Sequence, residues 1–332
     1  NSLFFLNIET GRTFHCTTLS QKPSRLFLID HQYQKYLFVC CGTTIKAMKL
    51  VIPWFVWNLN LSNPLRICRC DQFNHASRIL VSTDNSFVKF YSPKDGQKLA
   101  VATPSLAVNA VSFLYDRGLY ERYVFNEEKK QYSLEIMKTT KDDEQRDNLF
   151  VILEDGRVVG FNTSVSLCEQ TMSKQCKAAL MTLCKCDDEW CYALASENSD
   201  LYIYSYNDFK EIHHFTIVND KLQRMFYHYE SDCIVMVLKR ETLLYDIKKG
   251  KIIDQIRVNG NKVTELFGNM LKYGYDSGYI AQVNIVNRQL VPIDIDNMQR
   301  PHSDTITCFS FSPEFWISMS LDGRIIYWDY NM

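Results

Sequence analysis

The feature that most constrains this chain is a short β-like pattern that returns at a nearly constant interval along its 332 residues. In each copy an alternating apolar run ends just before a turn, at Asn7, Lys49, Tyr91, Asn162, Ser205, Asp246, Asn284 and Asp329. The intervals between neighbours are 42, 42, 71, 43, 41, 38 and 45 residues. Six of them lie in or near the period of about 40–45 residues typical of repeated four-stranded sheets, and the seventh adds an insertion of about 29 residues. We therefore expect an all-β protein built from repeats.

The last copy, residues 302–329, has the clearest strand pattern. Three short alternating runs are separated by turn residues, which predicts three antiparallel strands. Ser312-Pro313 supplies the first turn, and Asp322-Gly323 supplies the second as a tight hairpin pair.

This segment resembles the WD repeat. Members of that family place a His before the first strand, a Ser or Thr in the second, an Asp in the next turn and a Trp in the third. The resemblance assigns these places to His302, Ser320, Asp322 and Trp328. It implies a buried hydrogen-bonded network that locks the repeat, with every member satisfied and no catalytic role.

The same resemblance implies a seven-bladed β-propeller of four-stranded antiparallel blades. The C-terminal copy lacks a fourth strand, and we expect an N-terminal strand at residues 12–18 to complete this blade and close the ring, which would remove exposed strand edges. Residues 1–8 would then end a preceding element, and residues 9–332 would form one propeller. Eight blades are the alternative arrangement.

A charged insertion at about residues 116–147 interrupts one copy, between its first and second strands. Its composition favours a solvated, mobile loop. The alternative is an arm that binds a partner through Tyr132, Leu134 and Ile136, because alternate residues of a strand share a face. Elsewhere, Trp54 and Trp57 in a predicted outer strand are further candidate partner contacts, with packing against a flanking domain as the alternative.

Composition limits the classes of partner and compartment. The formal net charge is −1, so no basic footprint for nucleic acid is present. The twelve cysteines lie mostly in apolar runs of a long chain, which favours core packing in a reducing, cytosolic compartment over a disulfide framework. The first ten residues do not resemble a signal peptide, and the longest apolar run, Val51–Trp57, is too short to span a membrane.

The sequence nominates no catalytic, cofactor-binding or metal-binding group. Phosphate-binding glycine loops, nucleophile elbows and zinc-protease motifs are missing. Cysteines separated by one residue occur at Cys68 and Cys70 and at Cys184 and Cys186, with Cys191 nearby. Such spacing suits one face of a strand better than a zinc motif, and the pair His213-His214 has no matching carboxylate pattern.

We therefore expect a non-catalytic scaffold for protein–protein interactions, belonging to a larger multi-domain chain and complex. The degenerate, glycine-poor repeats are similar to those of large WD-repeat proteins of ciliary and flagellar axonemes, which implies microtubule-associated or axonemal partners and a cytoplasmic, cytoskeletal location. No nucleic acid or membrane partner is expected. The alternative is a peptide-reading adaptor of the ubiquitin-ligase, trafficking or ribosome-assembly type that uses the top face of the propeller.

Overall fold

In the computed structural model of the protein, structure is described for a set of ranges that covers most of the chain. These are residues 2–6, 13–18, 23–31, 34–41, 44–49, 54–60, 65–73, 76–83, 88–91, 97–103, 110–116, 118–126, 128, 131–139, 148–162, 168–198, 200–217, 220–293 and 300–330. Before residue 110, side chains are described only at 37–40, 44–47, 89 and 97, and after it at all described residues except 168 and 169.

Within these residues every regular element is a β-strand. Four antiparallel sheets contain four strands that follow one another along the chain. They are β3 (Pro23–His31), β4 (Gln34–Cys41), β5 (Thr44–Lys49) and β6 (Trp54–Asn60); β17 (Leu180–Cys186), β18 (Glu189–Ala195), β19 (Leu201–Ser205) and β20 (Glu211–Phe215); β21 (Leu222–His228), β22 (Cys233–Leu238), β23 (Glu241–Asp246) and β24 (Lys251–Arg257); and β25 (Asn261–Phe267), β26 (Met270–Tyr275), β27 (Ile280–Val286) and β28 (Gln289–Ile293).

Two further sets of four strands join into one eight-stranded sheet through a short parallel pairing of β10 with β16. The first set is β7 (Leu65–Phe73), β8 (Ala76–Thr83), β9 (Val88–Tyr91) and β10 (Lys98–Thr103). The second is β11 (Ala110–Asp116), β14 (Asn148–Leu153), β15 (Arg157–Asn162) and β16 (Cys168–Gln175). Between β11 and β14 the chain forms a separate two-stranded sheet of β12 (Leu119–Asn126) and β13 (Gln131–Lys138).

The last sheet combines both ends of the sequence, in the order β2-β1-β31-β30-β29. The strands β29 (Ile306–Phe311), β30 (Phe315–Ser320) and β31 (Arg324–Asp329) lie where the sequence predicts them. The N-terminal strands differ from the prediction, because β1 (Ser2–Leu6) pairs with β31 in parallel and β2 (Thr13–Thr18) pairs with β1 at the edge of the sheet. Residues 2–6 therefore lie within this sheet. The run Ser-Leu-Phe-Phe-Leu of β1 is more apolar than residues 13–18, which suits the position of β1 between β2 and β31.

Burial within one sheet explains why these sequences form these strands. Every residue of β22, Cys-Ile-Val-Met-Val-Leu, is buried, whereas β24 at the sheet edge has a mixed, partly exposed pattern. A strand covered on both faces needs a continuous apolar run rich in β-branched residues. The central strands therefore lie between neighbouring sheets, and the last strands β20, β24 and β28 face solvent.

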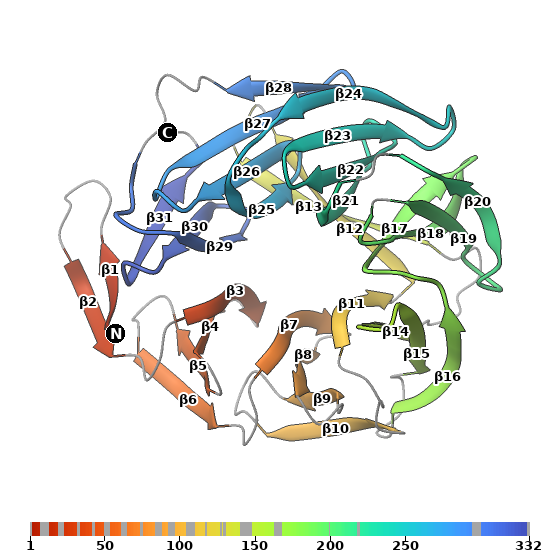
Figure 1. The fold of residues 1–332 in the computed structure, drawn as a ribbon. Helices are drawn as coiled ribbons and strands as arrows, with labels where there is room; N and C mark the ends of the chain where they lie inside the picture. The colour runs from red at the N-terminus through yellow and green to blue at the C-terminus, as the bar shows by residue number, and fades with distance from the viewer. Residues whose placement is uncertain are drawn as a thin grey trace.

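Successive sheets pack face to face. One core joins β17–β19 to β21–β23, and another joins β21–β23 to β25–β27. The first strands of the sheets also contact one another, since β7 contacts β3 and β11, β17 contacts β11 and β21, and β29 contacts β25 and β3. Figure 1 shows the sheets side by side around a common centre.

The repeat positions found in the sequence mark the same place in successive sheets. The third strands β5, β9, β15, β19, β23 and β31 end at the predicted equivalents, and Asn284 lies inside β27. Asn7 lies outside the described residues.

Candidate interaction site

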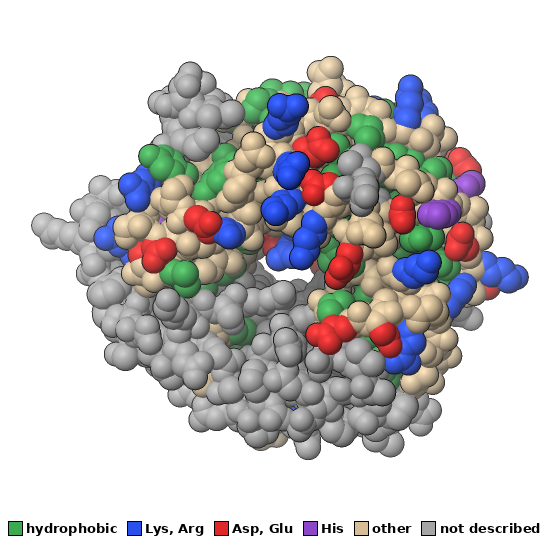
Figure 2. All heavy atoms as spheres, viewed as in Figure 1, with side chains coloured by type: hydrophobic (Ala, Val, Ile, Leu, Met, Phe, Trp, Pro, Cys, Tyr) green, Lys and Arg blue, Asp and Glu red, His purple; other side chains and the backbone are tan. Residues whose placement is uncertain are grey.

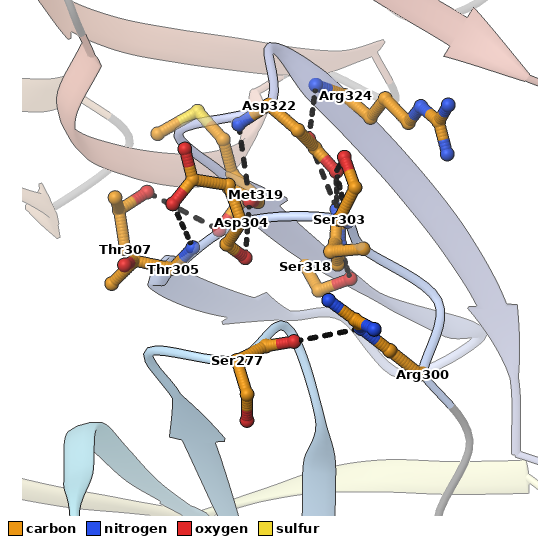
Figure 3. A network of polar contacts seen from close by, with 12 residues as sticks. Ser277, Arg300, Ser303, Asp304, Thr305, Thr307, Ser318, Met319, Asp322 and Arg324 are labelled. Carbon is orange, nitrogen blue, oxygen red and sulfur yellow. Dashed lines mark hydrogen bonds and ion pairs between the residues drawn. The ribbon is translucent and has the colours of Figure 1, made fainter.

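A polar network fastens the C-terminal sheet (Figure 3). His302 is fully buried, and its Nδ1 lies 3.2 Å from an Asp322 carboxylate oxygen. Because an ionised carboxylate only accepts, Nδ1–H is assigned as the donor and Nε2 as an acceptor. Ser318 Oγ lies 2.8 Å from Nε2 and accepts the indole N–H of Trp328 at 2.9 Å. The chain Asp322–His302–Ser318–Trp328 is therefore satisfied at each step.

The serine of this network is Ser318, so the assignment of Ser320 is corrected. Both hydroxyls are buried, and both residues lie on one face of β30 because they are two positions apart. Ser320 sits nearer the turn, where its hydroxyl donates to the carbonyl of Asp304 at 2.8 Å and accepts the N–H of Asp322 at 3.2 Å. It holds the turn, whereas Ser318 connects the two rings.

Asp322 is held as a carboxylate by its surroundings. Burial would raise its pKa, but hydrogen bonds from His302 and from the backbone N–H groups of Arg324 and Ser303 lower the pKa to about 2. Both backbone N–H groups donate at 2.9 Å, one to each carboxylate oxygen (Figure 3). Near neutral pH the group is therefore charged and accepts hydrogen bonds from His302 and from the backbone N–H groups of Ser303 and Arg324.

The insertion between β11 and β14 differs from a solvated loop, because residues 119–138 form a paired hairpin. Asp116, fully buried at its base, accepts the hydroxyls of Tyr192 at 2.6 Å and Tyr206 at 2.9 Å. On the returning strand, the Thr139 hydroxyl lies 2.6 Å from that of Tyr206. Both ends of the hairpin are thus fastened to the sheet of β17–β20.

One side of the hairpin docks on neighbouring sheets through Tyr120 and Arg122. The Tyr120 ring lies 5.0 Å from that of Trp190, and its hydroxyl donates to the carbonyl of Tyr227 at 3.2 Å. Arg122 forms an ion pair with Glu230 at 3.0 Å and lies 4.4 Å above the Tyr229 ring. In Figure 1 the hairpin passes behind the sheets of β21–β24 and β25–β28.

The outer part of the hairpin reaches the last two sheets. Tyr132 lies 4.7 Å from the rings of both Phe267 and Tyr330, and its backbone N–H donates to the carbonyl of Pro313 at 3.3 Å. Gly268 makes room for this contact, since a Cβ there would come within 2.8 Å of the Tyr132 ring, and its φ is +54°. Tyr132 is therefore an intramolecular anchor.

Leu134 and Ile136 follow Tyr132 at alternate positions and remain in solvent. Their exposed fractions are 40% and 55%. Of the three predicted anchors, Tyr132 therefore packs against the protein, whereas Leu134 and Ile136 are exposed to solvent. Trp54 and Trp57 lie in β6, but their side chains are outside the described residues.

Sequence reasoning missed the residues that position this hairpin. Tyr120 and Asp116 stand in a charged segment, and their partners lie far along the chain. The one local signal is the row of aromatic residues, which a solvated loop would not need.

The face seen in Figure 2 is hollowed at its centre, and Lys and Arg side chains gather over β21–β25 at its edge. Lys221, Lys239 and Arg240 are exposed in the turns just before β21 and between β22 and β23. The N–H of Lys239 donates to the carbonyl of Lys221 at 3.0 Å, which places their turns side by side. We call these three residues the basic rim.

Three chemically reactive side chains converge on the sheet of β17–β20. Cys186, Asp187 and His213 have their potential metal-binding atoms within 4.8 Å of one another. Sequence spacing assigned the cysteines of this region to core packing and gave His213 no partner.

No helix within the described residues has the length and apolar character that crossing a membrane requires.

No protein-family model matches the sequence. A search of curated proteins also finds no match. Among solved structures, the chain is similar to the crystal structure of a computationally designed protein, Ika8, with a TM-score of 0.59 and 10% identity, over 94% of this chain and 97% of the designed one. At this identity the likeness concerns the fold alone.

Proposed function

We propose that the chain is a divergent WD-repeat β-propeller of seven blades and that it serves as a non-catalytic scaffold for other proteins. Four-stranded antiparallel sheets in sequential order support this architecture. The link from Asp322 through His302 and Ser318 to Trp328 supports the WD resemblance, and contact of β29 with β3 supports a closed ring. The seventh blade would be β29–β31 completed by β1.

The observation that carries the scaffold function is the exposure of Leu134 and Ile136 on a firmly docked hairpin. Scattered apolar residues on a surface are ordinary, but these two share one strand face on a support fastened at both ends. A preorganised support reduces the entropy lost when a partner binds. The hairpin is therefore suited to hold a protein against this face.

We assign the partner to the microtubule-associated proteins of cilia and flagella. The support for this class is the resemblance of the degenerate repeats to axonemal WD-repeat proteins. The location that follows is the axoneme, within the cytoplasmic compartment.

Affinity capture from the protein's own cells tests the proposal, comparing the wild-type chain with a Leu134→Asp/Ile136→Asp variant. A matched control is Val291→Asp/Ile293→Asp, which changes another exposed apolar pair at alternate positions, with exposed fractions of 42% and 44%. We expect near-stoichiometric tubulin and axonemal proteins with the wild type and the control, and their loss from the hairpin variant.

The other outcomes separate the parts of the proposal. Recovery of ligase, coat or ribosome-assembly subunits would overturn the axonemal assignment and leave the scaffold function. Absence of any near-stoichiometric protein, under conditions that preserve known complexes of the same cells, would contradict the scaffold function itself.

A second candidate function, a peptide-reading adaptor, is favoured by the basic rim. Three exposed cations on neighbouring turns suit an acidic peptide, which would bind more weakly as salt increases. Fluorescence anisotropy with a poly-glutamate peptide tests this function. Binding that weakens in Lys239→Glu/Arg240→Glu supports it, and equal binding by both proteins contradicts it.

A further inference from the structure

The turn between β17 and β18 brings two potential metal ligands to one side of their sheet. Cys186 is the last residue of β17 and is buried, whereas Asp187 begins the turn and is exposed. Asp187 and Asp188 have φ angles of 51° and 65°. This tight turn fixes Asp187 directly beside the thiol.

The third group comes from β20, the edge strand of the same sheet. His213 is exposed, and its ring lies within 4.8 Å of both the Cys186 sulfur and an Asp187 carboxylate oxygen, measured between the closest potential ligand atoms. His214, the next residue, points to the other face of the strand, where it stacks on Tyr202 at 4.3 Å. Adjacent histidines therefore have different surroundings, and only one belongs to the cluster.

The chemistry of the three groups selects the ion. Zinc binds thiolate, imidazole and carboxylate ligands at about 2.0–2.3 Å, so ligand atoms around one ion lie closer together than 4.8 Å. The two exposed side chains have solvent on one side and can rotate inward. Calcium and magnesium prefer oxygen ligands alone, which makes a buried thiol unsuitable for them.

The surrounding charge also favours a cation. Asp188 and Glu189 follow Asp187 at the turn between β17 and β18, and Asp232 lies at the turn between β21 and β22. The positive group beside them is Lys248, which forms ion pairs with Asp232 at 3.0 Å and with Asp188 at 3.6 Å. Cys191, which pairs with Cys184 across β17 and β18, offers a further thiol next to the cluster.

We propose that Cys186, Asp187 and His213 bind a zinc ion that ties the edge strand β20 to the turn at the end of β17. The ion would fasten an otherwise exposed strand edge of this sheet. This role is independent of the scaffold function, because it concerns the integrity of one sheet.

Titration of the metal-free protein with Co²⁺, followed by absorption spectroscopy, tests the site, because cobalt replaces zinc and reports thiolate ligation through a near-ultraviolet charge-transfer band. Zinc affinity is then measured by competition with a chromophoric chelator. The variants are His213→Ala and the matched control His214→Ala. Both positions are exposed, so neither change removes a buried contact.

We expect the wild type to bind one equivalent of Co²⁺ with thiolate absorption, and Zn²⁺ to displace it. The zinc-binding constant should be at least about tenfold weaker in His213→Ala than in His214→Ala. Added zinc should also raise the thermal unfolding midpoint of the wild type but not of His213→Ala. Absence of the thiolate band, or equal zinc affinity in the two variants, would overturn the proposal.

Discussion

Ser318 accepts the indole N–H of Trp328 at 2.9 Å and lies 2.8 Å from His302 Nε2, so one hydroxyl joins two buried rings. Ser318→Ala would leave His302 Nε2 and the indole N–H of Trp328 without this partner, and a buried unsatisfied group costs about 1–3 kcal/mol. We expect a loss of that size in the free energy of unfolding, measured with urea. Ser133→Ala, which removes an exposed hydroxyl bonded to the carbonyl of Val124, is the control and should change little. An unchanged midpoint in Ser318→Ala would contradict the network's role.

The Asp322 carboxylate makes stability depend on pH in the acid range. Its folded pKa is about 2, because hydrogen bonds from His302 and two backbone N–H groups outweigh burial, while an unfolded Asp has a pKa of about 3.9. A lowered folded pKa adds stability that is present above about pH 4 and is lost as the pH falls through about 2. The difference in unfolding midpoint between the wild type and Asp322→Asn should shrink over that interval. A difference that stays constant would refute this assignment.

Lys272 should also make stability rise with pH, but in the neutral to alkaline range. Burial lowers its pKa to about 7, although its Nζ lies 4.1 Å above the Trp316 ring and donates to Gln282. An unfolded Lys has a pKa of about 10.4, so between the two values the unfolded chain binds more protons and folding gains stability as pH rises. Relative to Lys272→Met, the wild type should become more stable from about pH 7 to pH 10. Parallel pH profiles of the two proteins would show that Lys272 stays charged when folded.

The buried carboxylate of Asp116 should control the order of the hairpin. Asp116→Ala removes the acceptor for two tyrosine hydroxyls and the N–H of Gly118, so we expect a loss of about 1–3 kcal/mol. Relative to the wild type, amide hydrogen exchange in Asp116→Ala should speed up more in β12 and β13 than in β21–β24. The control is Asp155→Ala, which removes an exposed partner of Arg157. Unchanged exchange in the hairpin would mean that its aromatic contacts suffice without the carboxylate.

The sequence predicted the strands of the last repeat and the interval between sheets because both depend on local patterns. Alternation and turn residues define β29–β31, and the same pattern returns at the ends of β15, β19 and β23. Which serine joins the network was not predictable from spacing, because Ser318 and Ser320 share a strand face and only the packed rings distinguish them.

The hairpin and the metal-ligand cluster depend on contacts between distant residues. The charge of the insertion predicts a loop, and nothing local shows that Tyr132 meets Tyr330 or that Tyr120 meets Trp190. Likewise, Cys186 and His213 lie on strands at opposite edges of one sheet, and a single sequence does not reveal that their side chains approach each other. The order of β1 and β2 was missed because two short strands can enter a sheet either way.

Cryo-electron microscopy of the complex captured from cells tests the central claim most directly. The account predicts seven four-stranded blades in a closed ring, with a partner protein covering Leu134 and Ile136 of β13. A complex in which these two side chains remain in solvent, with every partner bound elsewhere, would contradict the hairpin as the binding arm.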